Sequence, residues 1–344
     1  MSSEDANPAA DESSASLRKL ALQATASWGL RAKSISLIKQ RENAVYRLQT
    51  EDDKLFALRV HRAGYHSDAA LNSEFVWMKA LQESGINVPT FLLSLSDSVV
   101  VTTSHASLDA PRQVDILHWI EGDQLGSVEE GLSENGEEIT KIYSVIGKTM
   151  AQLHIHSTTW GTPAGFTRHA WDAAGLVGEM PFWGRFWELA SLSPEERKLI
   201  VRAREAVAEK LSELPKTSTH FGMIHADLVP ENILISGGEI RLIDFDDAGF
   251  GWYLFDIATA LYFIQDDPNY GLAKAALISA YQEVRELPQE ELDNLPLFLL
   301  ARSFTYLGWV HTRSESFEAQ ELAPMLIEMC LAAVARYGEV ANKS

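Results

Sequence analysis

The residues best suited to chemistry lie within residues 223–246. His225 is followed two positions later by Asp227 and seven positions later by Asn232, and Asp244 comes twelve positions after the asparagine. A carboxylate on a loop, such as that of Asp227, can orient an acceptor hydroxyl and take its proton. The oxygens of Asn232 and Asp244 are hard ligands that can hold Mg²⁺ against the phosphates of a nucleotide. The set as a whole therefore indicates phosphoryl transfer.

The same segment has the pattern of a β-hairpin. Two apolar runs, 233–236 and 239–243, flank a Gly-Gly pair, and such a pair is typical of a tight turn. A hairpin here would fold Asp244 back towards Asn232, as a shared metal site requires. The alternative is a hairpin whose polar residues serve only as turn and cap residues.

In these residues the chain resembles the aminoglycoside phosphotransferase and choline kinase family, distant relatives of the protein kinases. The order His225, Asp227, Asn232 closely matches the family's H-x-D-x-x-x-x-N catalytic loop, and residues 243–245 match its I-D-F metal motif. The resemblance implies that Asp227 is the catalytic base, that Asn232 and Asp244 bind Mg²⁺, and that His225 is a buried organiser of the loop.

The resemblance extends over about residues 25–335, although its motifs are concentrated in 223–256. It implies a protein-kinase-like, two-lobed α+β fold, with a small antiparallel-sheet lobe and a larger helical lobe. It also implies ATP and Mg²⁺ as cofactors and a hydroxyl group as phosphate acceptor.

A predicted strand at 54–61 supplies candidate nucleotide contacts. Because side chains alternate along a strand, Leu55, Ala57 and Arg59 share one face. The small Ala57 would leave room for a flat adenine, and Arg59 would lie beside the phosphates. The family usually has lysine at this cation position.

Glu74 is the expected partner of Arg59. It lies inside the apolar stripe of a helix predicted over 68–83, and a carboxylate there is costly unless it is paired. The alternative is that both side chains extend past the apolar surface to water.

The segment expected to cover the phosphates, 39–44, contains no glycine. It resembles the family's Asn-x-x-Tyr-Arg loop only through Asn43, Tyr46 and Arg47, and we take Asn43 as a candidate nucleotide contact. The adenine is expected at the backbone of 116–120, with Leu117 and Ile120 packed against it.

The family often continues with Gly-Asp-Pro after I-D-F, whereas this chain reads Gly-Trp-Tyr at 251–253 before Asp256. This variant resembles the homoserine kinase and bacterial stress-response kinase branches. Asp256 is expected to hydrogen-bond the backbone of the catalytic loop. Asp246 and Asp247 either tune the metal or are solvated.

A helix predicted near 295–313 carries an unusual face of cations and aromatics: Arg302, Tyr306, Trp309 and Arg313. This face is either a surface stripe or a cleft wall that captures the carboxylate of an acceptor. Four tryptophans between 156 and 187 either pack the helical lobe or wall a substrate site: Trp160, Trp171, Trp183 and Trp187.

The elements that would position these residues divide the chain into three parts. Residues 1–16 are expected to be a disordered tail. Residues 17–118 are expected to be the nucleotide-binding lobe, with a short helix at 17–28 and strands at 44–50, 54–61, 99–103 and 113–117. Residues 119–344 are expected to be the helical lobe with the catalytic loop and the acceptor site.

Charge and composition limit the possible partners. The chain has 29 basic and 48 acidic residues, a net charge of −19, which repels nucleic acid and anionic membrane surfaces. No run of 18 apolar residues occurs, so no membrane span is predicted. The start has no secretory pattern, and the single Cys330 makes neither an internal disulfide nor a structural zinc site alone. A cytoplasmic protein is expected.

The acceptor is predicted to be a small hydroxylated metabolite, either an amino alcohol, a hydroxy amino acid such as homoserine, or an aminoglycoside-like molecule. The negative charge favours a cationic acceptor, whereas the arginines at 302 and 313 favour a carboxylate. Two alternatives remain: a protein Ser/Thr kinase resembling the stress-response kinases, and a catalytically inactive nucleotide-binding module.

Overall fold

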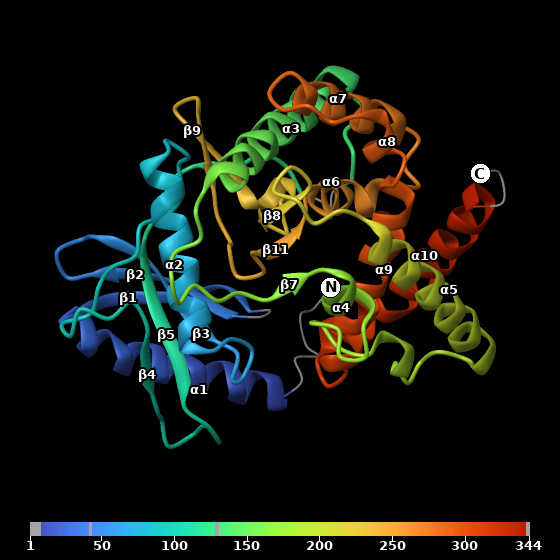
Figure 1. The fold of residues 1–344 in the computed structure, drawn as a ribbon. Helices are drawn as coiled ribbons and strands as arrows, with labels where there is room; N and C mark the ends of the chain where they lie inside the picture. The colour runs from blue at the N-terminus through green and yellow to red at the C-terminus, as the bar shows by residue number, and fades with distance from the viewer. Residues whose placement is uncertain (1–7, 41–42, 128–130, 342–344) are drawn as a thin grey trace. The chain divides into compact units, whose positions relative to one another are not determined.

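The computed structural model describes residues 8–40, 43–127 and 131–341 (Figure 1). The chain separates into two compact units. Unit 1 extends to Gly122 and includes Pro163–Thr167, and unit 2 contains the rest. The first boundary falls at Gly122, a few residues beyond the expected one at 118.

Unit 1 is a sheet with two main helices. Its elements are α1 (Pro8–Ala24), η1 (Thr25–Trp28), β1 (Ala32–Gln40), β2 (Asn43–Thr50), β3 (Leu55–His61), α2 (Asp68–Glu83), β4 (Val101–Thr103) and β5 (Arg112–His118). Within the described residues of this unit, five strands form one antiparallel sheet in the order β1-β2-β3-β5-β4.

The two faces of this sheet have different roles. Phe56, Leu58 and Val60 of β3 point to one face and form a core with Leu20 of α1. Burial of these apolar side chains stabilises the sheet on α1. The intervening residues of β3 point the other way, towards α2, which begins after the capping hydroxyl of Ser67.

The N-terminal helix begins earlier than the sequence predicted. Residues 8–16 lie in α1 and not in a disordered tail, while residues 1–7 lie outside the described part. Leu20, Ala21 and Ala24 are buried and anchor the helix, and a proline in its first turn loses no helical hydrogen bond. Strand β1 was not predicted, because only Ile35 of this strand is buried and its alternation is weak.

Unit 2 is mainly helical. Its helices are α3 (Gly136–Thr159), α4 (Ala173–Val177), η2 (Phe186–Glu188), α5 (Pro194–Glu213), η3 (Pro230–Asn232), α6 (Tyr253–Leu261), η4 (Tyr262–Ile264), α7 (Tyr270–Gln282), α8 (Gln289–Leu292), α9 (Leu295–Thr312) and α10 (Phe317–Ala341). Its strands are β6 (Asp123–Gln124), β7 (Ala170–Trp171), β8 (Phe221–Ile224), β9 (Ile233–Ser236), β10 (Glu239–Leu242) and β11 (Gly249–Trp252).

Two small sheets in the described part of unit 2 hold the chemistry-bearing segment. The predicted hairpin is formed by β9 and β10, with β6 added beside β9. The second sheet has the order β7-β11-β8. Helices surround these short strands, with α3 beside α7 and α9 beside α10 (Figure 1). The α+β fold class is confirmed. No helix in the described ranges has both the length and the apolar character that crossing a membrane requires.

Candidate active site

The backbone is strained next to Asp227, in the loop between β8 and η3, and again at Asp244, after β10. Ala226 and Asp244 both adopt left-handed conformations, with φ of 63° and 66°, which are unfavourable for residues other than glycine. Asp256 at the start of α6 stabilises the first of these. Its Oδ1 accepts a hydrogen bond from the backbone N of Ala226 at 2.6 Å, and its Oδ2 accepts one from the backbone N of His225 at 3.1 Å. The predicted role of Asp256 is confirmed.

A buried hydrogen-bond chain supports Asp256 from behind. His154, inside α3, lies 3.0 Å through Nε2 from Oδ2 of Asp256, and its Nδ1 lies 2.8 Å from the hydroxyl of Tyr281. Burial lowers the pKa of His154 despite the hydrogen bond to Asp256. A neutral imidazole can donate to Asp256 and accept from Tyr281 at the same time.

His225 joins the catalytic loop to the second motif. Its side chain is fully buried, and Nε2 donates to the carbonyl of Ile243 at 3.0 Å. Its ring also packs against Phe245 at a centroid distance of 4.7 Å. His225 is therefore a buried organiser, as predicted.

The carboxylate of Asp227 is held at both oxygens. Asn232 Nδ2 donates to Oδ2 at 2.9 Å, and Arg302 Nη2 lies 3.3 Å from Oδ1. The Asp227 side chain is 27% exposed, whereas that of Arg302 is 0% exposed. A fixed carboxylate that still reaches solvent is suited to accept a proton from a bound hydroxyl.

The orientation of Asn232 suits a metal ligand. Its Nδ2 also donates to the carbonyl of Asp227 at 2.8 Å, so its amide nitrogen is engaged and its amide oxygen can serve as a ligand. The backbone N of Ile243 donates to the carbonyl of Asn232 at 3.0 Å, which brings the adjacent Asp244 to the same end of the hairpin.

One amide oxygen and one carboxylate suit Mg²⁺, which prefers oxygen ligands and binds through few protein groups together with substrate phosphates. The described ranges contain no group of three or more His, Cys, Asp or Glu side chains that could hold a metal ion by themselves. The donor set therefore fits an ion that the nucleotide shares, and it does not fit an all-protein cage.

A clamp fixes the loop after Asp244 by its carbonyl groups. Arg168 donates through Nε to the carbonyl of Ala248 and through Nη2 to those of Phe245 and Asp246. Trp171 Nε1 donates to the carbonyl of Asp247 at 2.9 Å.

Asp246 and Asp247 are 2% and 8% exposed, so the solvated alternative for them is wrong. Trp171 and Trp183 are buried, with ring centroids 5.3 Å apart. These two tryptophans pack the unit.

The cationic face of α9 is not a surface stripe. Arg302, Trp309 and Arg313 are all buried. Arg302 contacts Asp227 and does not line an open wall. Arg313 donates through Nη1 to the hydroxyl of Thr312 at 2.9 Å. The contact between Arg302 and Asp227 was missed because 75 positions separate them and no local pattern joins them.

In unit 1 the predicted pair of Arg59 and Glu74 is confirmed. Arg59 Nη1 lies 2.9 Å from Glu74 Oε1, and the two side chains are 8% and 0% exposed. The alternative in which both extend to water is therefore wrong.

Asp115 and His61 complete this cluster, and sequence reasoning missed both. Asp115 accepts from Arg59 Nε at 2.8 Å and from Nη2 at 2.6 Å, and its Oδ2 also lies 2.8 Å from His61 Nε2. Burial by itself would raise the pKa of Asp115, but Arg59 and His61 outweigh it and hold the pKa below its usual value.

Strand register brings most of the expected nucleotide contacts to one face of the sheet. Ala57 lies opposite Leu117, and Asn43 lies opposite His61, two positions along β3 from Arg59. Directly opposed residues in an antiparallel pair share a face. Asn43, Ala57, Arg59 and Leu117 therefore point to the same side, and Asn43 Oδ1 is buried without a hydrogen-bond partner among the described residues.

Two expected contacts are less closely defined. Ile120 follows the end of β5 and is half-buried, so strand register does not place it on this face. The segment 39–44 spans the end of β1 and the start of β2, and its residues 41–42 lie outside the described part.

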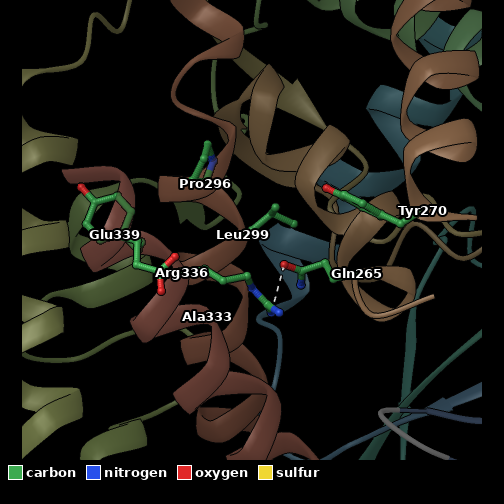
Figure 2. A pocket seen from close by; sticks show the side chains of 8 residues that line it. Gln265, Tyr270, Pro296, Leu299, Ala333, Arg336 and Glu339 are labelled. Carbon is green, nitrogen blue, oxygen red and sulfur yellow. Dashed lines mark hydrogen bonds between the residues drawn. The ribbon is translucent and has the colours of Figure 1, made fainter. Parts of the chain in front are cut away.

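A separate cavity of about 280 Å³ lies in unit 2. Figure 2 shows its lining, where Arg336 of α10 donates to Gln265 at 3.4 Å beside Tyr270 and Leu299. The described residues that line it include none of the expected site residues. We therefore do not assign it to the reaction.

Comparisons with known proteins identify the family. A model of the phosphotransferase enzyme family, APH, matches residues 34–287. A microcompartment-associated aminopropanol kinase of known structure is 32% identical, with a TM-score of 0.79 over 92% of this chain and 95% of that one. Amicoumacin kinase from Bacillus subtilis (strain 168) is 25% identical over 84% of this chain and 83% of its own length.

A homoserine kinase from Chelativorans sp. (strain BNC1) is 36% identical over 47% of this chain and 51% of its own length. The solved structure of an amicoumacin kinase with AMP-PNP and Ca²⁺ has a TM-score of 0.72 at 19% identity, covering 92% of this chain and 93% of that one. The family model and the aminopropanol and amicoumacin kinase relatives over most of the chain show that the chain belongs to the phosphotransferase enzyme family and is an ATP-dependent phosphotransferase with an alcohol group as acceptor.

Proposed function

We propose that this enzyme transfers the γ-phosphoryl group of ATP, with Mg²⁺, to the hydroxyl of a small amino alcohol. The observation that carries the proposal is the carboxylate of Asp227, which is held at both oxygens yet is 27% exposed. In that position Asp227 orients the acceptor hydroxyl and takes its proton as the oxygen attacks phosphorus.

Asn232 and Asp244 hold the metal in this proposal. Mg²⁺, when bound, neutralises charge on the transferring phosphates. Asn232 offers its amide oxygen because its amide nitrogen is engaged by Asp227, and Asp244 offers a carboxylate. The left-handed backbone at Asp244 sets the direction in which its side chain leaves the main chain. In this proposal catalysis rests on positioning and charge neutralisation.

The nucleotide contacts are proposed for the α2-facing side of the unit 1 sheet. Ala57 and Leu117 form an apolar surface suited to adenine, and Asn43 has a buried amide oxygen able to accept a hydrogen bond. Ile120 is proposed to pack against the same base. Arg59 is engaged by the carboxylates of Glu74 and Asp115. We therefore propose that it assists phosphate binding through its positive charge, while Glu74 anchors it in position.

The burial of Arg302 in α9, and of Arg313 directly after it, removes the argument for a carboxylate on the acceptor. Arg302 and Arg313 are 0% and 5% exposed and already engaged, so the α9 face does not offer an open anion site. The net charge of −19 favours a protonated amine. The aminopropanol kinase, which matches over nearly the whole chain, acts on a molecule of this kind.

Homoserine is the second candidate acceptor. The homoserine kinase from Chelativorans sp. is 36% identical over its matched half, and homoserine carries an amino group, a hydroxyl group and a carboxylate. The relatives described above are named for small molecules, which favours this class over a protein acceptor.

A panel of matched acceptors tests the proposal. Release of ADP is coupled to an optical assay with three acceptors: 1-amino-2-propanol, 1,2-propanediol, which lacks the amine, and homoserine, which carries a carboxylate besides its amino and hydroxyl groups. We expect kcat/KM for the amino alcohol to exceed that for the diol by at least about tenfold, the effect of one unpaired polar group. A higher kcat/KM for homoserine or for the diol would contradict the proposed acceptor class.

A further inference from the structure

Arg302 is buried next to the catalytic carboxylate in an unusual way. Its side chain is 0% exposed, and its polar contacts all run through one nitrogen. Nη2 lies 3.3 Å from Asp227 Oδ1 and donates to the hydroxyl of Tyr306 at 2.9 Å. The other two nitrogens, Nε and Nη1, are buried without hydrogen-bond partners among the residues that the structure describes.

Aromatic rings surround the rest of the guanidinium. Its carbon lies 4.4 Å from the ring centre of Tyr306, 5.0 Å from that of Trp183 and 5.5 Å from that of Phe255. Cation–π attraction recovers part of the lost hydration, but buried donors without acceptors remain unfavourable. An apolar side chain of similar length would pack here at least as well, so the burial of Arg302 is not explained by stability.

We propose that Arg302 is a positioning residue for Asp227. It holds Oδ1 of Asp227 while Asn232 holds Oδ2. One contact would leave the carboxylate free to rotate, whereas two contacts from different elements fix its orientation. Arg302 has no exposed surface, so it acts through Asp227 and does not touch the acceptor. Tyr306, one turn along α9, fixes Arg302 in turn.

This inference rests on the proposed role of Asp227 as base. Arginine suits the task because its guanidinium stays charged at all ordinary pH values and its rigid fork aims Nη2 along a defined direction. Lysine would keep the charge but would place a mobile ammonium against Oδ1.

The first test compares Arg302→Met, Arg302→Lys and the control Arg313→Met. Arg313 is a buried arginine that directly follows the last residue of the same helix, and it contacts Trp309 and Thr312. For Arg302→Met we expect kcat to fall about 100-fold, as for a misplaced catalytic group, with KM for ATP within about twofold of the parent. The melting temperature should change little, and Arg302→Lys should recover part of kcat.

Arg313→Met should keep kcat within about twofold of the parent, because Arg313 does not contact Asp227. Equal losses of kcat in the Arg302 and Arg313 variants would assign a general structural role to both and overturn the inference. Parent-like kcat in Arg302→Met would overturn it as well. If Arg302→Met fails to fold, the same comparison is made with Arg302→Lys, where a parent-like kcat again contradicts the inference.

A double-mutant cycle with Asp227→Asn separates this inference from the proposed function. A residue that acts only through Asp227 should add less than about a twofold loss of kcat when Asp227 is already replaced. A full further loss from Arg302→Met in that background would overturn the positioning role. Parent-like turnover by Asp227→Asn alone would instead remove Asp227 as base, and the proposed function would fail whatever Arg302 does.

Discussion

Each unit contains a buried arginine that pairs with carboxylate groups, but the number of paired nitrogens differs between the two arginines. In unit 1, Arg59 meets Asp115 through Nε and Nη2 and Glu74 through Nη1. In unit 2, Arg302 makes its polar contacts with the described residues through Nη2 alone, and aromatic rings surround the rest of its guanidinium. Arg59 is paired at every nitrogen, whereas Arg302 is paired at one nitrogen among the described residues and meets a single carboxylate.

The difference indicates what each arginine is for. A buried charge whose donors are all paired stabilises its surroundings only while each partner is present. A buried charge with unpaired donors has a cost in stability, and we attribute its presence to the one group it holds, Asp227. Changes around Arg59 should therefore act mainly on stability, and changes around Asp227 mainly on turnover.

The largest expected effect is on the side of catalysis. Asp227→Ala should lower kcat by about 10³- to 10⁴-fold, the upper part of the range for general base catalysis, with ATP affinity within a few fold of the parent. Its melting temperature should also fall, because the change leaves the fully buried guanidinium of Arg302 without its carboxylate partner. Turnover assays, calorimetry with ATP and thermal melts measure the three quantities, and a loss of ATP affinity equal to the loss of kcat would remove Asp227 from the base role.

Asp244→Asn should act on the metal. An amide cannot neutralise the charge of Mg²⁺ as a carboxylate does. Loss of a residue that only hydrogen-bonds a metal ligand already lowers metal affinity about 10- to 100-fold, so loss of a ligand should cost at least as much. We expect a loss of about that size in Mg²⁺-dependent ATP affinity. Titrations of ATP at several Mg²⁺ concentrations measure it, and an unchanged Mg²⁺ dependence would contradict the metal assignment.

In unit 1 the effect should move to stability. Glu74→Ala leaves Arg59 with one buried partner fewer and should lower the free energy of unfolding by about 3 kcal/mol. Glu51→Ala is the control, because Glu51 pairs with Arg31 at 3.9 Å with both side chains largely exposed, where such pairs contribute at most about 1 kcal/mol. Denaturant titrations compare the two, and additive effects of Arg59→Ala and Glu74→Ala in a double-mutant cycle would contradict the coupling.

The smallest expected effect is a pH dependence. The pKa of Asp115 is lowered in the folded protein, so its contribution is fully present above the unfolded pKa of about 3.9 and is lost as pH falls through the lower folded value. The difference in melting temperature between the parent and Asp115→Asn should be constant from about pH 7 to pH 5 and shrink below about pH 4. If the difference in melting temperature shrinks already between pH 7 and pH 5, the pH dependence of stability arises from a group other than Asp115.

Local patterns predicted the hairpin of the catalytic segment and the pairing of Arg59 with Glu74. The spacing of His225, Asp227 and Asn232 lies within one loop, and the Gly-Gly turn that returns Asp244 is a local signal. Likewise, the apolar stripe of 68–83 predicted the bounds of α2 and the inward direction of Glu74.

Contacts between distant segments were the part that sequence reasoning missed. Asp115 lies 56 positions from Arg59, and Arg302 lies 75 positions from Asp227, so each pair depends on how separate elements pack. The edge strand β1 was missed for a related reason, because a strand with one buried residue has almost no alternation to detect.

The central claim is that a hydroxyl oxygen held by Asp227 attacks the γ-phosphorus of ATP. The most direct measurement is ³¹P NMR of the product formed from ATP, Mg²⁺ and 1-amino-2-propanol labelled with ¹⁸O in its hydroxyl group. The account predicts a phosphate ester that keeps the ¹⁸O in its bridge, at a rate that Asp227→Ala abolishes. A phosphoramidate on the amine, or free phosphate as the only product, would contradict it.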